Sequence, residues 1–583
     1  LEASGGTLGL SIGVSKAEAK LQGGTAVEIA SGQTFVANDV NFASTGASLK
    51  NENDNNAEAS ITGGSGSAVI ITVNNANAIA NTESILNVGS EQYTTGIWQE
   101  ASSESHEKQN VAQAKEQATD QNTENKEIPT ETILTAGRAS VKDGGSNVNM
   151  LLGSVVSTRA EAKGLAVGAI ASGTNKAYTT NTSKTILNFN PVTFEAESLR
   201  IAMGNGDKSN TLANGNGGGI VGISPVAARA EHNNDSEVTL NIGNDQTQTE
   251  FNLEKDFYLG VANVVEEEIN SNAIQAAIAG GSGVEAASTN ISNANLNLTN
   301  TTINAKGEVA LDAENYHDFN KATDYVIKGN GYGIGYVDIA KFNNVITQNA
   351  NVNLKNTTIV SQGKVDIAAH NDNNIKSNIY VLSAGGVAGA FATNTIDFNS
   401  SSLVDIDNAS AIRADGLNSD ITLAASDQNK ITTMTMAESI GAIGTPTTAK
   451  NNNNITRNNK VTVDGTVYGR HDVRLFAGRN EHDEDSSLTL STYAEAFNKT
   501  AIPLGSLPSI NNNLNQNNQV YIKGNGQINA VKDVNIYADA GKETYDIFSN
   551  AYTSWGSKGK SKVVVSTNGK VNEGQSIDIY GRK

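Results

Sequence analysis

Apolar and polar residues alternate along most of this chain, so that every second side chain is apolar. The clearest stretch is 363–374, GKVDIAAHNDNN, in which Val365 and Ile367 flank Asp366. A period of two is typical of a β-strand with one buried face, because successive side chains of a strand point to opposite sides. The runs last four to eight residues and end in Asn, Asp and Gly, which favour turns. The pattern predicts an all-β chain of short strands, with Val365 and Ile367 inside and Asp366 outside.

The alternating strand recurs at a nearly constant interval. Copies of the pattern V/I-x-L/I-x-A start 56, 56, 52 and 61 residues apart, at Val309, Val365, Ile421, Val473 and Val534. Weaker copies start at Leu199, Tyr258 and Ile577. A period of this size indicates an array of supersecondary units.

Each unit has its parts in the same order. The alternating strand and a polar turn come first, a Gly- and Ala-rich stretch such as 384–390 follows, and an Asn-rich corner leads into further strands. We expect about two coils of three short strands per unit of about 55 residues, stacked as an elongated parallel β-helix, a solenoid. Gly permits tight bends in such a stack, and Asn at equivalent corners can form side-chain ladders. At ~4.8 Å per coil, the stack would be a rod roughly 100 Å long.

One segment, Tyr93–Pro129, interrupts the alternation. It is polar, rich in Glu, Gln and Lys, and its centre, Glu104–Gln117, contains good helix formers. The sequence therefore divides into β-helix repeats over 1–92, a polar insertion over 93–129 that forms a loop or short helix, and the same solenoid continued over 130–583. The insertion is either a tolerated loop or a binding platform, because long loops on ordered scaffolds are often functional.

Composition narrows the class of protein. The 583 residues include 56 Gly, 6 Pro and only 5% aromatic residues, which favours many small stacked layers over one large core. The absence of Cys excludes disulfides and thiolate metal sites. A formal charge of −20 argues against binding to nucleic acid, which requires a basic face. There is no apolar run long enough for a membrane helix, and we interpret the chain as a fragment of a longer one.

Two polar clusters are candidates for catalysis, because β-helical enzymes that cleave polysaccharides use acidic and basic residues gathered on one face. They are Asp472 with Arg470 and Arg474, and the group His482, Asp483, Glu484 and Asp485. Both clusters fall where other units place turn residues, so we interpret them as solvated turns.

No cofactor is expected. Four histidines lie near the ends of equivalent strands and could together hold a metal: His317, His370, His471 and His482. Their distances from the start of the strand differ, which argues against a shared site. The calcium-binding pattern GGxGxD does not occur. The most cationic and aromatic patches are weak binding candidates for a glycan or an anionic lipid, with a solvated turn as the alternative; they comprise Trp98, Trp555, Lys558, Lys560 and Lys562.

The repeated VxLxA strands, the Asn-rich turns such as the one after Val365–Ala369, the Gly-Ala stretches and the lack of Cys resemble the repeat region of filamentous-haemagglutinin-type exoproteins, including leukotoxin-type filamentous adhesins. The resemblance covers nearly the whole chain except Tyr93–Pro129, and it rests on composition and period. It implies a right-handed β-helix, export through an outer-membrane two-partner transporter (type V secretion), and a place on the bacterial cell surface or among secreted proteins.

The function that follows is a non-enzymatic adhesin stalk or fibre that serves attachment, aggregation or biofilm formation. Its expected partners are a host or bacterial cell-surface glycan or protein and further copies of the chain in fibres. The alternative is a β-helical polysaccharide-degrading enzyme, which would need an acidic or basic cluster that spans adjacent coils and faces a cleft.

Overall fold

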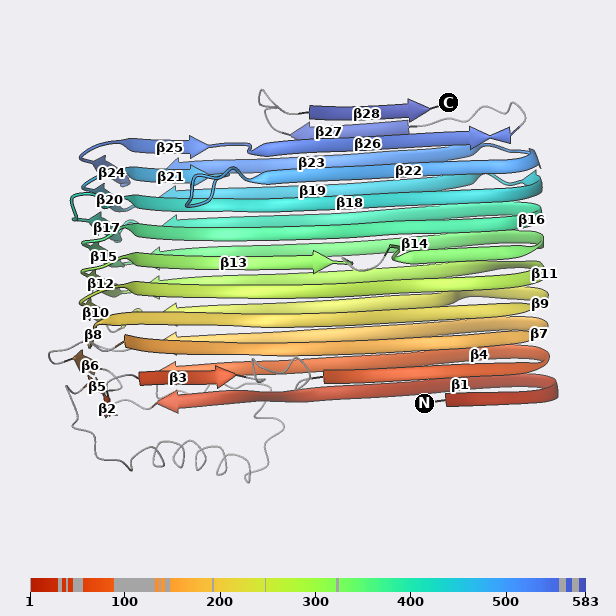
Figure 1. Ribbon diagram of the computed structural model, residues 1–583, viewed down its shortest axis with the longest axis horizontal. Coiled ribbons are helices and arrows are strands. Elements are labelled where there is room, and N and C mark those ends of the chain that lie inside the picture. The colour runs from red at the N-terminus through yellow and green to blue at the C-terminus, as the bar shows by residue number, and fades with distance from the viewer. Residues whose placement is uncertain are drawn as a thin grey trace.

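The computed structural model describes residues 2–29, 34–37, 40–45, 56–88, 132–135, 138–141, 147–190, 193–246, 248–320, 324–554, 562–568 and 576–582. These residues form an all-β protein whose elements are strands, as predicted (Figure 1). The strands are β1 (Glu2–Ile29), β2 (Thr34–Ala37), β3 (Val40–Thr45), β4 (Asn56–Val88), β5 (Thr132–Thr135), β6 (Arg138–Val141), β7 (Asn147–Phe189), β8 (Thr193–Ala196), β9 (Ser198–Ile242), β10 (Thr249–Leu253), β11 (Phe257–Thr299), β12 (Thr301–Ala305), β13 (Val309–Phe319), β14 (Ile327–Lys355), β15 (Thr358–Ser361), β16 (Val365–Ile406), β17 (Ala411–Ala414), β18 (Ile421–Gly444), β19 (Thr447–Val463), β20 (Thr466–Gly469), β21 (Val473–Ala477), β22 (Ser487–Ile502), β23 (Ser506–Ile522), β24 (Gln527–Ala530), β25 (Val534–Ala538), β26 (Lys542–Thr553), β27 (Lys562–Asn568) and β28 (Ser576–Arg582).

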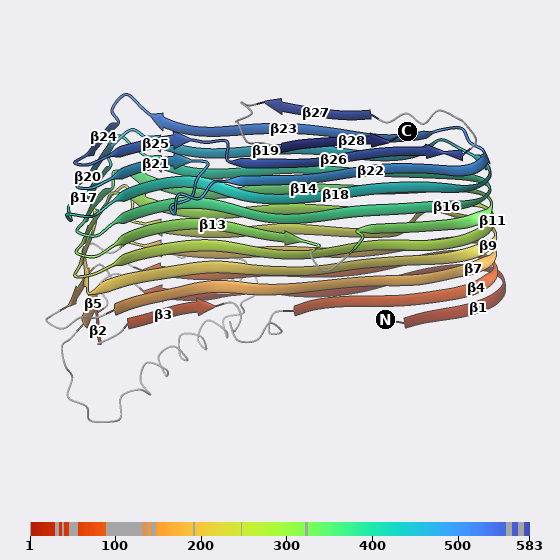
Figure 2. The ribbon, with the colours of Figure 1, turned by 45° about the horizontal axis from the view of Figure 1, so that its top comes forward.

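The chain repeats one path. A long strand such as β11 crosses one broad face, bends back at one end of the molecule and returns along the other broad face, and a short strand such as β12 follows at the opposite narrow edge (Figures 1 and 2). We call one such passage a level. Eighteen strands form the sheet of the long faces, and ten short strands form a second sheet along the narrow edge. Among the named strands every pairing is parallel except β2–β5 and β5–β6.

The backbone register places equivalent residues of successive levels side by side. One ladder of directly paired residues runs through Val40, Val148, Leu199, Phe257, Val309, Val365, Ile421, Val473 and Val534. Val309 pairs with Val365 itself, so the stretch of chain from one to the other makes a single passage. The expectation of two coils per unit is therefore wrong.

The ladder also tests the weaker sequence copies. Leu199 is the equivalent of the clear copies, as predicted. The copy assigned to Tyr258 starts one residue earlier, at the buried Phe257, since that residue pairs with Val309. Ile577 pairs with Tyr545 in a long arm and is not an equivalent of Val534.

The strands are much longer than the four to eight residues that the alternation predicted. In β11, buried residues alternate with partly or fully exposed ones along both arms, from Phe257 to Ala277 and from Val284 to Thr299. The polar group 370–374, for which the sequence predicts a turn, lies inside β16, with Asn371 and Asn373 buried. Polar side chains occupy inward positions of a continuous strand, so polarity alone did not mark a turn.

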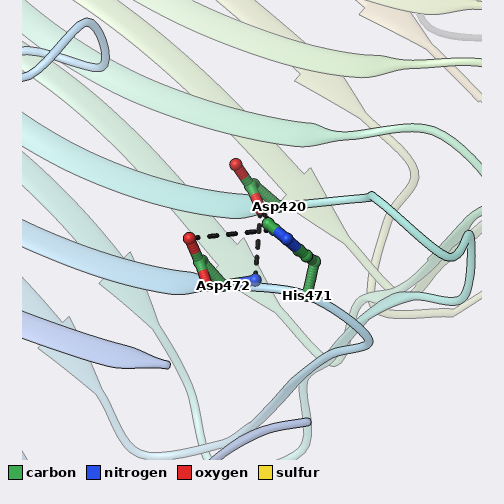
Figure 3. Close-up of side chains that lie close together, drawn as sticks. All are labelled: Asp420, His471 and Asp472. Carbon is green, nitrogen blue, oxygen red and sulfur yellow. Dashed lines mark hydrogen bonds and ion pairs between the residues drawn. The ribbon is translucent and has the colours of Figure 1, made fainter. Parts of the chain in front are cut away.

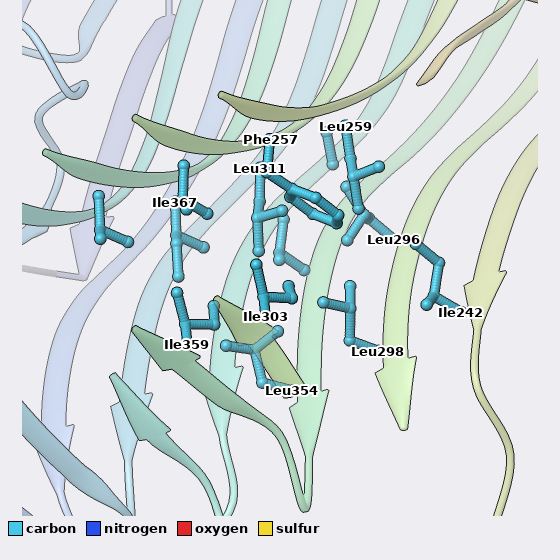
Figure 4. Close-up of a cluster of buried hydrophobic side chains, with 14 of the residues drawn as sticks. Ile242, Phe257, Leu259, Leu296, Leu298, Ile303, Leu311, Leu354, Ile359 and Ile367 are labelled. Atoms are coloured by element: carbon cyan, nitrogen blue, oxygen red, sulfur yellow. The ribbon is translucent and has the colours of Figure 1, made fainter. Parts of the chain in front are cut away.

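Large aliphatic and aromatic side chains fill the interior next to the short strands. This cluster includes Phe251, Ile303, Ile359 and Ile412 from the short strands together with residues of both broad faces (Figure 4). A second buried cluster, rich in Ala, fills the part of the interior nearer the bend. Val365 and Ile367 are fully buried in the first cluster, and Asp366 is half-buried beside Lys364, so the predicted strand face is confirmed.

Glycine makes the bend of the long strands possible. Gly333, Gly385 and Gly441 lie in one column at the bend, and a Cβ atom on any of them would overlap the carbonyl oxygen of the residue in the preceding level. The Gly- and Ala-rich stretches therefore permit close approach of levels, as the sequence indicated.

Asparagine ladders join the levels, as expected. On one outer face, Asn241 donates to Asn188 at 2.9 Å, Asn297 to Asn241 at 3.0 Å and Asn353 to Asn297 at 2.9 Å. Most ladders lie along the strands, not only at corners. A corner ladder also exists, in which Asn356 donates to Asn300 at 2.9 Å, and both residues have positive φ.

The predicted insertion 93–129 lies outside the described residues. β4, which precedes it in the chain, pairs with β7, which follows it, over the whole length of β4.

The longest dimension of the described molecule lies along the strands (Figure 1). One arm of β11, at ~3.3 Å per residue, is about 70 Å long. The nine levels of the ladder, together with β1 before them and β28 after them, stack at ~4.8 Å to about 50 Å. The expected rod, elongated along the stack, is therefore wrong for this chain. The cause is that each repeat of the sequence supplies one wide level instead of two narrow coils.

Candidate functional site

Asp420, His471 and Asp472 come together at a corner of the molecule (Figure 3). Asp420 immediately precedes β18, and His471 and Asp472 precede β21 in the next level. The pairing of Ile421 with Val473 brings these two turns side by side. The imidazole Nδ1 of His471 lies 2.5 Å from Asp420 Oδ1 and 3.7 Å from Asp472 Oδ2. An acidic and basic cluster that spans adjacent levels therefore exists, and it contains the predicted candidates Asp472 and His471.

Two further cations contact the same carboxylates. Arg474 Nη2 lies 3.1 Å from both Asp420 Oδ2 and Asp472 Oδ2, and Lys532 Nζ from a third level lies 3.5 Å from Asp472 Oδ2. Burial alone would raise the pKa of Asp420, but hydrogen bonds from His471 and the Asp472 backbone N–H, and the charge of Arg474, hold it below its usual value.

The chemistry of this cluster is that of an ion-pair network. Its two carboxylates are balanced by the Arg474 and Lys532 side chains, so a divalent cation bound there would have to compete with two fixed positive charges. A catalytic acid is usually a carboxyl group in surroundings that keep it protonated, away from positive charges. Both carboxylates here lie next to positively charged side chains instead. The arrangement can join three levels at a corner of the molecule.

The other sequence candidates for catalysis do not meet this cluster. Arg470 donates to the backbone carbonyl of Asp415 at 3.3 Å and is not part of the network. The group His482, Asp483, Glu484 and Asp485 lies in the loop between β21 and β22. Arg479 binds Asp483 at 2.8 Å and Asp485 at 3.2 Å and so closes this loop. The His482 side chain is 71% exposed, which fits the interpretation as a solvated turn.

The histidines proposed as a stack are not aligned. His317 pairs with Asn373, and His370 pairs with Ser426, so no two of the candidates share a register position in the described ladders. His317 is instead buried against Glu267, which His232 also contacts. The sequence patterns did not single out His232.

Glu267 is the centre of a buried polar group. Its carboxylate accepts hydrogen bonds from Ser288 and Asn290, each at 2.9 Å, and lies 3.2 Å from His232 Nε2 and 3.5 Å from His317 Nε2. Burial would raise the pKa of Glu267, but the two neighbouring histidines hold it far below its usual range. The alternation along β11 could have revealed this group. Counted in steps of two from the buried Phe257, Glu267 falls on an inward position.

A second buried network surrounds Arg457, whose side chain is 1% exposed. Arg457 forms a bidentate pair with Asp427, at 2.7 Å and 2.9 Å, and reaches Glu543 at 3.3 Å. Burial would raise the pKa of Asp427, but the charge and hydrogen bonds of Arg457 hold it below its usual value. Asp427 continues a buried Asn column, in which Asn263 donates to Asn315 and Asn315 to Asn371, each at 2.9 Å.

These interior groups are closed to ligands. Glu267, Arg457 and Asp427 are at most 1% exposed. Their partners come from the two broad faces of the same or adjacent levels, except that Glu543 lies two levels beyond Arg457. Such networks cross-link the faces. They also disfavour a change of register, because a strand that slipped by one residue would turn its inward charge to the outer face and away from its partner.

The weak binding candidates fall almost wholly outside the described residues. Trp98, Trp555, Lys558 and Lys560 lie outside them, and Lys562 is described only as the first residue of β27, paired with Ser509. Within the described part of the chain, no helix has the length and apolar character needed to cross a membrane.

Comparison with protein-family models, with curated proteins and with solved structures gives no match to this chain.

Proposed function

We propose that this chain is a rigid spacer within an extracellular bacterial adhesin, a stalk or fibre segment that acts without catalysis. The observation that carries the proposal is the uninterrupted ladder from Val40 to Val534, in which each level is hydrogen-bonded in register to the next.

The physical basis is that every interior level satisfies the backbone groups of its two neighbours. Further levels would lengthen such a stack without enlarging its core, and the stability of the stack would be a sum of similar terms. The Asn ladders and the corner network of Asp420 and Asp472 add side-chain links in the same direction.

The finer fold is part of this proposal. We infer a right-handed parallel β-helix in which each repeat of the sequence forms one level. The handedness, the two-partner export and the cell-surface location rest on the resemblance to filamentous-haemagglutinin-type exoproteins. In this proposal the described levels act as a spacer. The receptor, a cell-surface glycan or protein, is bound elsewhere in the fibre.

Single-molecule force measurement tests the spacer. With handles at Glu2 and Arg582, the chain should unfold level by level, and each step should release about 56 residues, or roughly 190 Å of contour length. A single cooperative event that releases the whole chain would contradict a stack of quasi-independent levels.

A further inference from the structure

Exposed isoleucines occupy the bend of the long strands. Ile220, Ile278 and Ile334 lie at the tips of three consecutive levels and are 57%, 51% and 66% exposed. The pairings of Gly219 with Ala277 and of Ala279 with Gly335 place these tips one above the other. Three neighbouring aliphatic side chains that remain in water are unusual for a surface that has no partner.

The isoleucines are the centre of a longer apolar edge along the bend. We define the apolar edge by its exposed large side chains: Leu165, Val167, Ile170, Ile220, Ile223, Ile274, Ile278, Tyr332, Ile334, Ile339, Val387, Ile440, Ile443, Ile502, Leu504 and Leu507. A single register column runs along it, through Ile170, Val221, Ala279, Gly335, Val387, Ile443 and Ile502.

The apolar edge also carries almost no charge in the sequence: all of its residues lie in charge-free stretches except Ile339, which follows the buried Asp338. The stretches that form the bend contain no Asp, Glu, Lys or Arg, although the chain has 61 acidic and 41 basic residues; they are 164–175, 209–228, 269–284, 329–337, 377–396, 439–449 and 500–522. The acidic excess of the chain is therefore carried by its other surfaces.

The area of the apolar edge is sufficient for a stable protein contact. Each of these half-exposed side chains leaves on the order of 80 Å² in water, so that the edge as a whole offers roughly 1,200 Å². A standard specific interface needs about 800 Å² from each partner.

We propose that the apolar edge binds the apolar edge of a second copy of this chain. A second copy has rows of side chains with the same spacing of ~4.8 Å, so the ridges of one edge can fit between those of the other over their full length. Contact between the two apolar edges brings together the surfaces with the least charge. Contact through any other surface would place acidic residues of one chain against those of the other, because each chain has a net charge of −20. The contact is edge to edge, so it widens the assembly and leaves the ends of each stack free.

Sedimentation equilibrium of the full chain tests the proposal. The wild type should form dimers at micromolar concentration, and the double variant Ile278→Glu/Ile334→Glu should weaken dimerisation at least tenfold, because it places four carboxylates in the contact. The matched control is Leu417→Glu/Val531→Glu, at residues that are 71% and 66% exposed in the turns beside the short strands, at the opposite narrow edge, and it should dimerise as the wild type does. A monomeric wild type at 100 micromolar, or equal weakening by both variants, would overturn the proposal.

Cross-linking provides the second measurement. Because the chain has no Cys, Ile278→Cys introduces a single thiol at the centre of the apolar edge. Mild oxidation should convert Ile278→Cys to a covalent dimer and leave Leu417→Cys monomeric. The opposite result, or binding of a monomeric wild type to phosphatidylcholine vesicles, would assign the edge to another partner and contradict self-association.

Discussion

At the scale of single residues, the buried carboxyl groups differ in whether a basic side chain lies beside them. Asp427 is paired with Arg457, and Glu267 lies between two histidines, so the pKa of each carboxyl is held down. Asp338 is 1% exposed and accepts a hydrogen bond from Ser282, and no ion pair reaches it among the described residues. Burial raises the pKa of Asp338 to about 7. This carboxyl is thus a source of instability at neutral pH.

We expect Asp338→Asn to stabilise the protein at pH 8 and to have little effect near pH 4. A carboxyl whose pKa is higher in the folded than in the unfolded chain contributes fully below the unfolded value of 3.8 and loses that contribution as the pH rises towards 7. The gain at pH 8 should be about 2–4 kcal/mol, which chemical denaturation at both pH values measures. Asp366→Asn, at a half-buried outward position, is the control. A gain from Asp338→Asn that does not change with pH would contradict the assignment.

At the scale of elements, the unit of this protein is a long bent strand and not a short one. β11 and β16 each alternate along both of their arms and turn only where glycine allows levels to approach closely. The alternation continues through polar stretches because inward polar residues find partners in the adjacent level, as Asn315 does with Asn371. Register and strand face are therefore fixed jointly by the apolar cluster and the polar columns.

The strand face is tested by substitution in β16. Ile367→Asp should destabilise the protein by several kcal/mol because it buries an unpaired charge, whereas Asp366→Asn should cost less than about 1 kcal/mol. Urea denaturation measures both. Should Ile367→Asp fail to fold, Ile367→Val should still cost about 0.5–1.5 kcal/mol for the lost methylene group. Equal effects at positions 366 and 367 would refute the assigned face.

At the scale of the whole molecule, the described levels form a slab that is longer along the strands than along the stack (Figures 1 and 2). A slab of about 70 by 50 Å and two sheets thick has a radius of gyration near 25 Å, which is also roughly the value for a compact chain of this length. The rod expected from the sequence would have given roughly 30–45 Å. The radius of gyration alone therefore cannot separate the slab from a compact globule.

Small-angle scattering of Ile278→Glu/Ile334→Glu, used to keep the sample monomeric, should give a radius of gyration of about 25–28 Å. Its pair-distance distribution should extend to about 80 Å with a long shoulder, because the slab is thin. A radius in the range of the rod would contradict one level per repeat.

The sequence by itself determined the β class, the period and the inward face of the clearest strands. These follow from local patterns: the alternation of Val365, Asp366 and Ile367 specifies a face, and the recurrence of VxLxA specifies equivalent positions. Only the tertiary structure decided how many levels a repeat makes. A polar stretch such as 370–374 forms a turn if its side chains need water, but it continues the strand if the next level supplies hydrogen-bond partners for the inward side chains. The structure also decided which polar residues meet. Asp420 and His471 belong to different repeats of the sequence, and their contact depends on a register that sequence spacing alone left open.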